Sequence, residues 1–128
     1  MKLKVAVGTD DNKKFTNEHF GDSKYFLIYN WDDDGIHLVE ERKNIKFDEE
    51  THGDAKKASH ISNQLKDVNV LMAKVFGPNI VRIRKNYVPV VSRIDIIEEA
   101  LNLLNSRKEE ILENIEKEGD KDIIYLEK

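Results

Sequence analysis

Residues 24–40 read KYFLIYNWDDDGIHLVE, and the order of residue types in this stretch decides the fold class. Residues 24–31 are rich in aromatic and β-branched side chains, which favour a strand. Residues 32–35 are turn formers, and residues 36–40 alternate between apolar and polar. The stretch therefore predicts two antiparallel strands joined by a tight turn, a β-hairpin.

A further strand precedes this hairpin. Residues 2–7 alternate and then become continuously apolar, and the run ends in the sequence GTDDN at residues 8–12. This pattern predicts a buried first strand followed by a loop.

Beyond the hairpin, helical and strand patterns follow one another. From Asp54, the expected N-cap, small and apolar residues recur at three- and four-residue spacing, as in a surface helix. Residues 68–73 and 87–91 are short apolar runs, and the turn at residues 77–79 opens a helix between them. Strands separated by helices predict a parallel half-sheet, so the fold class is α/β, with an N-terminal strand and antiparallel hairpin followed by βαβα units.

The C-terminal third continues the helical pattern. Residues 95–98 (DIIE) and 106–109 (SRKE) both have capping-box spacing, so the helix that starts at Asp95 either runs on or restarts before Gly119. Residues 122–126 predict a short terminal strand. We expect one domain over residues 1–105 and a helical extension, residues 106–128, that packs on the same domain.

Composition excludes several classes of function. The chain has 128 residues, 36 % of them charged, with a net charge of -4 and no cysteine. The acidic balance argues against nucleic acid as a partner, and the lack of a long apolar run argues against a signal peptide or membrane span, so we expect a cytoplasmic protein. High charge without cysteine is also typical of thermophile proteins. Without thiolates, a metal cluster must be bound through imidazole, carboxylate or backbone groups.

The loop after the first strand contains His19-Phe20-Gly21, just before the aromatic strand. With this His-Phe-Gly loop, a His52-Gly53 pair and a glycine turn at Gly77, the chain resembles the dinitrogenase iron-molybdenum cofactor biosynthesis family. The resemblance covers residues 1–105 and departs from the family pattern at residues 74–76 and 86–88. It implies a ribonuclease-H-like three-layer fold and a role in carrying the cofactor or its precursor.

Three histidines are candidate metal ligands: His19, His52 and His60. Neutral imidazole binds iron well, and we expect it to hold an iron-sulfur or iron-molybdenum cluster transiently, at one or two open coordination positions. The candidate cofactor-binding residues are His19, Phe20, Gly21, His52, Gly77 and Asn79. The alternatives are that His19 only shapes its loop, that His52 and His60 are ordinary surface residues, and that Gly77 only permits a tight turn.

Two classes of function fit these residues. The first is a carrier without catalysis of its own, which receives a cluster from a donor protein or delivers it to an acceptor protein. Such a carrier could be a homodimer. The second is a regulatory or protein-interaction module of the same fold that binds a small anion or a partner without a cluster. A nuclease site at Asp10 and Asp11, with Glu40 or Glu41, is a weaker fit, because these aspartates lie in a typical turn.

Overall fold

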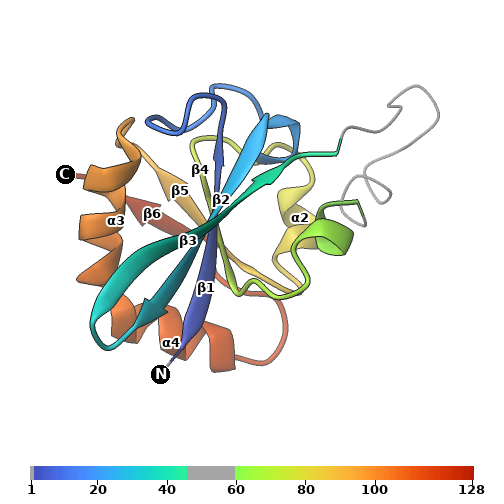
Figure 1. Cartoon of the computed structure of the whole chain (residues 1–128). Coiled ribbons are helices and arrows are strands. Elements are labelled where there is room, and N and C mark those ends of the chain that lie inside the picture. The colour runs from blue at the N-terminus through green and yellow to red at the C-terminus, as the bar shows by residue number, and fades with distance from the viewer. Residues whose placement is uncertain (1, 46–59) are drawn as a thin grey trace.

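The predicted hairpin forms one edge of a mixed six-stranded sheet (Figure 1). The computed structural model describes residues 2–45 and 60–128. The strand order is β3-β2-β1-β4-β5-β6, in which the β1–β2 and β2–β3 pairs are antiparallel and the other three pairs are parallel. The elements are β1 (Leu3–Thr9), the 3-10 helix η1 (Phe20–Asp22), β2 (Tyr25–Asp32), β3 (Gly35–Lys43), β4 (Val70–Ala73), α2 (Ile80–Ile83), β5 (Val88–Ser92), α3 (Ile97–Asn105), α4 (Lys108–Glu116) and β6 (Ile124–Leu126).

Helices cover both faces of this sheet. Helices α3 and α4 lie on one face, and α2 and the helical residues 60–64 lie on the other (Figure 1). Each face has its own apolar cluster, centred on Trp31 and Leu104 on the first and on Phe20 and Leu71 on the second. The predicted α/β class and three-layer architecture, with an antiparallel hairpin followed by parallel strands, are therefore confirmed. The predicted N-cap Asp54 lies outside the described residues.

Both predicted capping boxes are wrong, because the side chains that would cap bind other groups. Helix α3 starts after Ile96 without a side-chain cap, while the Asp95 carboxylate lies 2.7 Å from Lys74 Nζ. Ser106 Oγ donates to the Leu103 carbonyl at the end of α3, and α4 restarts after Arg107. The sequence predicted that the helix either runs on or restarts before Gly119, and the structure shows that it restarts.

The last 23 residues contribute to the same core as the rest of the chain. Ile111 of α4 and Leu126 of β6 are fully buried in the cluster that contains Leu104. Strand β6 pairs with β5, which confirms the short terminal strand. The boundary at residue 105 stays a prediction. Among the described residues, no helix has the length and apolar character needed to cross a membrane.

The Arg42–Asp67 pair ties β3 to the chain that leads into β4, and it should make stability depend on pH. Two parallel hydrogen bonds of 2.9 and 2.8 Å join the groups, and the Arg42 guanidinium lowers the pKa of Asp67 from 3.8 to about 2. A lowered pKa stabilises the fold above pH 4, and this contribution is lost as the pH falls towards 2. Because the Asp67 side chain is 44 % exposed, we expect about 1 kcal/mol after solvent screening.

Urea denaturation of the wild type and Asp67→Asn between pH 5 and pH 2 tests this expectation. The wild type should be more stable at pH 5, and the gap between the two proteins should close as the pH falls. Parallel stability curves would contradict the assignment of this pH dependence to Asp67.

Candidate functional site

The loop after β1 and the loop after β4 meet at the carboxyl ends of these two neighbouring parallel strands. His19 forms an isolated parallel bridge with Val75, and the Phe20 amide donates to the Val75 carbonyl at 2.8 Å. From β1 the chain continues to β2 on one side, and from β4 it continues to β5 on the other. The two loops therefore lie at a topological switch point, where open α/β sheets commonly bind ligands.

Phe20 anchors the first of these loops. Its side chain is fully buried, with its ring centroid 5.0 Å from that of Phe26 and 5.4 Å from that of Phe76. The residue before it, His19, is exposed. Phe20, which the sequence placed among the cofactor-binding residues, thus presents no surface to a ligand in this conformation and acts by holding His19 at the surface.

The His19 ring lies directly against Gly77. A Cβ atom added to Gly77 would be 2.5 Å from His19 Nδ1 and 2.6 Å from Cε1, closer than any real contact. Gly77 also has a φ of 74°, which favours glycine. The structure therefore brings together two of the predicted site residues and gives Gly77 a role beyond permitting a turn.

A narrow pocket opens beside the His19 ring. Its volume is about 20 Å³, which is room for a water molecule. The pocket is lined by His19, Gly21, Asp22, His60, Ile61, Phe76 and Asn79. His60 also makes a hydrogen bond through Nε2 to the Ile45 carbonyl, and its role as a ligand stays a prediction. The predicted ligand His52 lies outside the described residues.

Asn79 supplies a buried polar group to this pocket. Its side chain is 9 % exposed, and its Oδ1 atom accepts no hydrogen bond within the described part of the chain. Asn79 makes no side-chain cap on α2 either. A buried acceptor without a donor typically costs about 1–3 kcal/mol, so this oxygen is poised for a donor or a cation that enters the pocket.

A family model described as dinitrogenase iron-molybdenum cofactor matches residues 1–107. The chain belongs to this family. The match ends between α3 and α4, close to residue 105, where the resemblance predicted the end of the family domain. A solved structure from Methanocaldococcus jannaschii, provisionally named a dinitrogenase, has a TM-score of 0.57 and 24 % sequence identity, over 83 % of this chain and 90 % of that chain. At this identity the likeness shows the fold alone. No curated protein matches the chain.

In this iron-molybdenum cofactor family member, Asn44 is the residue that holds the site together, and sequence reasoning missed it. Asn44 Nδ2 donates to the carbonyls of Gly21 and Ser23, both at 2.8 Å, and its Oδ1 accepts from Gln64 at 3.0 Å. Asn44 is buried at the end of β3. It therefore ties the His19 loop both to the sheet and to the helical residues next to His60.

The carboxylates of the first loop shape that loop. Asp10 accepts from Thr16 Oγ1 and from the Lys24 amide, both at 2.9 Å. Asp11 accepts from the amides of Lys14 and Lys13, which lower its pKa. Within residues 2–45 and 60–128, no three His, Cys, Asp or Glu side chains are grouped to hold a metal ion. These contacts support the turn interpretation of the aspartates over a nuclease site.

Proposed function

We propose that this family member binds an iron-sulfur or iron-molybdenum cluster, or its precursor, as cargo and passes it on without chemistry of its own. The observation that carries the proposal is the exposed imidazole of His19, seated on Gly77 at the switch point of the sheet. Imidazole is a suitable ligand for iron. The contact with Gly77 positions the His19 ring, which lowers the entropy cost of ordering the ring when the cluster binds.

The size of the pocket indicates where the cargo sits. A space of about 20 Å³ excludes a multi-atom cluster, so the cluster lies over the mouth of the pocket with His19 at one open coordination position. The chain contains no cysteine, so thiolates add nothing to the attachment. A cluster held by imidazole alone is released readily, which is what delivery to an acceptor protein requires.

His60 and Asn79 line the same pocket and are the further candidate ligands within the described residues. The hydrogen bond from Nε2 of His60 to the Ile45 carbonyl would fix the orientation of its ring, as is usual for metal-binding histidines. His52 stays a predicted ligand of the same cluster.

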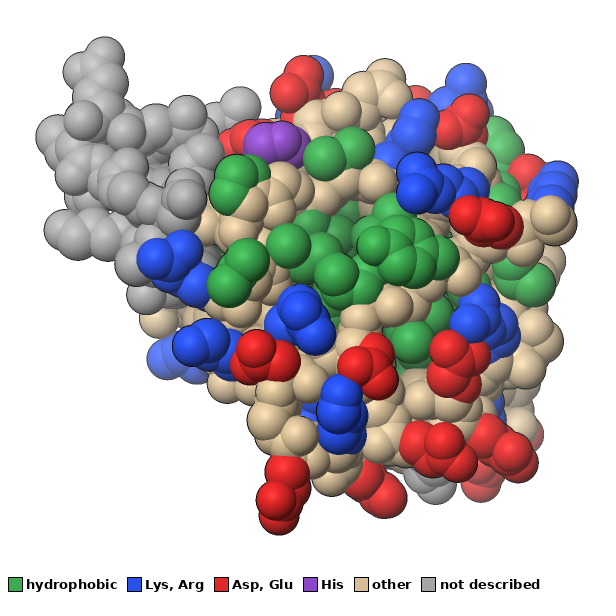
Figure 2. Space-filling model, turned by 180° about the vertical axis from the view of Figure 1, so that it is seen from behind, with side chains coloured by type: hydrophobic (Ala, Val, Ile, Leu, Met, Phe, Trp, Pro, Cys, Tyr) green, Lys and Arg blue, Asp and Glu red, His purple; other side chains and the backbone are tan. Residues whose placement is uncertain are grey.

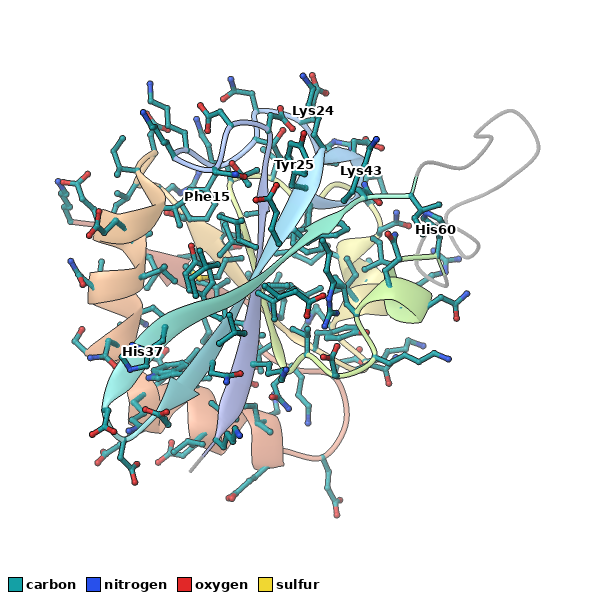
Figure 3. The ribbon with its side chains drawn as sticks, in the orientation of Figure 1. Phe15, Lys24, Tyr25, His37, Lys43 and His60 are labelled. Carbon is teal, nitrogen blue, oxygen red and sulfur yellow. The ribbon has the colours of Figure 1, made fainter. Side chains whose placement is uncertain are left out.

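Replacing His19 by alanine tests the proposal, because it removes the ligand and leaves its seat. Anaerobic incubation with ferrous iron and sulfide should give the wild type a visible cluster absorption, and His19→Ala should lose at least about tenfold in cluster occupancy. The matched control is His37→Ala: His37 is also exposed, but it lies on β3, far from His60 (Figure 3). A colourless wild-type protein, or equal losses in both variants, would overturn the proposal.

The second candidate is a regulatory or interaction module that binds no cluster. It is favoured by the Asn79 Oδ1 atom, which has no hydrogen-bond donor among the described residues and could bind a small ligand. A single water-sized ligand would fill the pocket without any cluster. The anion version of this candidate has less support: α2 has only four residues, and the unpaired atom is an acceptor, which suits a donor. The incubation described above separates the two candidates.

A further inference from the structure

One segment of this acidic protein contains basic residues but no acidic residue. Residues 68–94 carry five basic residues and no acidic residue, in a chain whose net charge is -4. The five are Lys74, Arg82, Arg84, Lys85 and Arg93. This segment forms β4, α2 and β5, and acidic residues from elsewhere in the chain lie against some of its basic residues.

Two of these five residues have charges available to a partner. Lys74 pairs with Asp95 at 2.7 Å, and Arg93 approaches Glu127 at 3.7 Å. Arg82 and Lys85, on α2 and just after it, are exposed and form no ion pair with the described residues. Positive charge on α2 is thus not neutralised within the described part of the chain.

Next to α2 lies an apolar patch, which we define as Val75, Val81 and Tyr125 with the partly buried Ile80 and Ile123. Val75 is 41 %, Val81 61 % and Tyr125 48 % exposed. On this side of the sheet β5 is buried, and the exposed apolar side chains come from the four-residue helix α2, the loop after β4 and the edge strand β6. Figure 2 shows hydrophobic side chains gathered in the middle of the molecule seen from behind, with lysine and arginine as well as aspartate and glutamate side chains around them.

Strand β6 is the edge of the sheet, but its edge is partly closed. Arg107 Nη1 donates to the Tyr125 carbonyl at 2.8 Å, and the Arg93 guanidinium lies 5.7 Å from the centre of the Tyr125 ring. A blocked carbonyl hinders the addition of another strand at this edge. The patch therefore offers side chains to a partner.

A second copy of the chain is a poor occupant of this patch. In a two-fold dimer both copies use the same surface, so Arg82 and Lys85 of both copies would be brought into one interface. Like charges facing one another disfavour such a contact. A partner with acidic residues around an apolar centre avoids this repulsion.

We infer that the apolar patch, with Arg82 and Lys85, is the docking surface for an acidic protein that donates or accepts the cargo. The role of this partner rests on the proposed function, whereas the docking itself does not. Val75 belongs to the patch and also pairs with His19, so a docked protein would lie beside the cluster ligand. Local positive charge also steers an acidic partner towards a protein that is itself negative overall.

The test uses an acidic [4Fe-4S] ferredoxin as the probe, titrated into the full-length protein at low and at moderate salt. Amide shift changes should concentrate at Val75, Val81 and Tyr125, and affinity should fall as salt rises. Arg82→Glu combined with Lys85→Glu should weaken binding at least tenfold. The matched control is Lys43→Glu, an exposed charge on β3 at the opposite edge of the sheet (Figure 3), which should change affinity less than twofold.

Three outcomes would overturn the inference: equal losses in the Lys43 control, no loss in the Arg82 and Lys85 variant, or a dimer of the wild type that Val81→Asp dissociates. His19→Ala separates this inference from the proposed function, because it should lose the cluster and keep the ferredoxin. If the wild type binds ferredoxin but never a cluster, the proposed function fails while the docking surface stands.

Discussion

Gly77→Ala should destabilise the protein by about 1–2 kcal/mol and reduce cluster binding to the level of His19→Ala. The methyl group would meet the His19 ring at 2.5 Å, so the ring must leave its seat. Alanine also prefers negative φ, and holding it at 74° costs about 1–2 kcal/mol, whereas the exposed His19 ring can move aside at a smaller cost. Urea denaturation and anaerobic cluster loading measure the two effects.

Gly119→Ala is the matched control for the backbone part of this effect. Gly119 has a φ of 83°, but an added Cβ would meet no atom within 4 Å. The Gly119→Ala variant should therefore lose only the backbone contribution, about 1 kcal/mol of stability, and keep cluster binding. The double variant His19→Ala/Gly77→Ala should recover part of the stability lost in Gly77→Ala, since the clash is removed. Undiminished cluster binding in Gly77→Ala would contradict a role for the contact between His19 and Gly77.

The strands could be predicted because their signals are local. The hairpin at residues 24–40 has its turn between its two strands in sequence, and each short apolar run became a strand. The helix starts failed for the opposite reason. Asp95 has the spacing of a cap, but Lys74, which is remote in sequence, binds its carboxylate. No local pattern reports such competition.

The site was predictable in part. His19, Gly77 and Asn79 were candidates, and the structure places them around one pocket or against one another. What the sequence could not show is why Gly77 must be glycine, because the atom that a side chain would strike belongs to a loop almost sixty residues earlier. The unpaired oxygen of Asn79 also appears only once the packing is known.

Asn44 shows this limit most clearly, since its partners lie about twenty residues away on either side in sequence. Nothing in the sequence around it indicates a functional role. Its side chain satisfies two carbonyls of the His19 loop that the surrounding packing shields from water, and an unsatisfied buried carbonyl costs about 1–3 kcal/mol. A single amide therefore connects three parts of the site.

Asn44→Ala should accordingly lose about 2–3 kcal/mol of stability, because two carbonyls lose their donor at once. Cluster loading should also fall, since the loop that presents His19 loses its tie to β3. Asn63→Ala is the matched control: Asn63 is exposed in the neighbouring helical residues and should change stability by less than about 0.5 kcal/mol. Asn44→Asp keeps the shape but replaces the donating Nδ2 by a carboxylate oxygen, an acceptor that faces two carbonyl acceptors, so at neutral pH it should be at least as destabilising as alanine. If Asn44→Asp were as stable as the wild type, these hydrogen bonds would not be what holds the His19 loop in place.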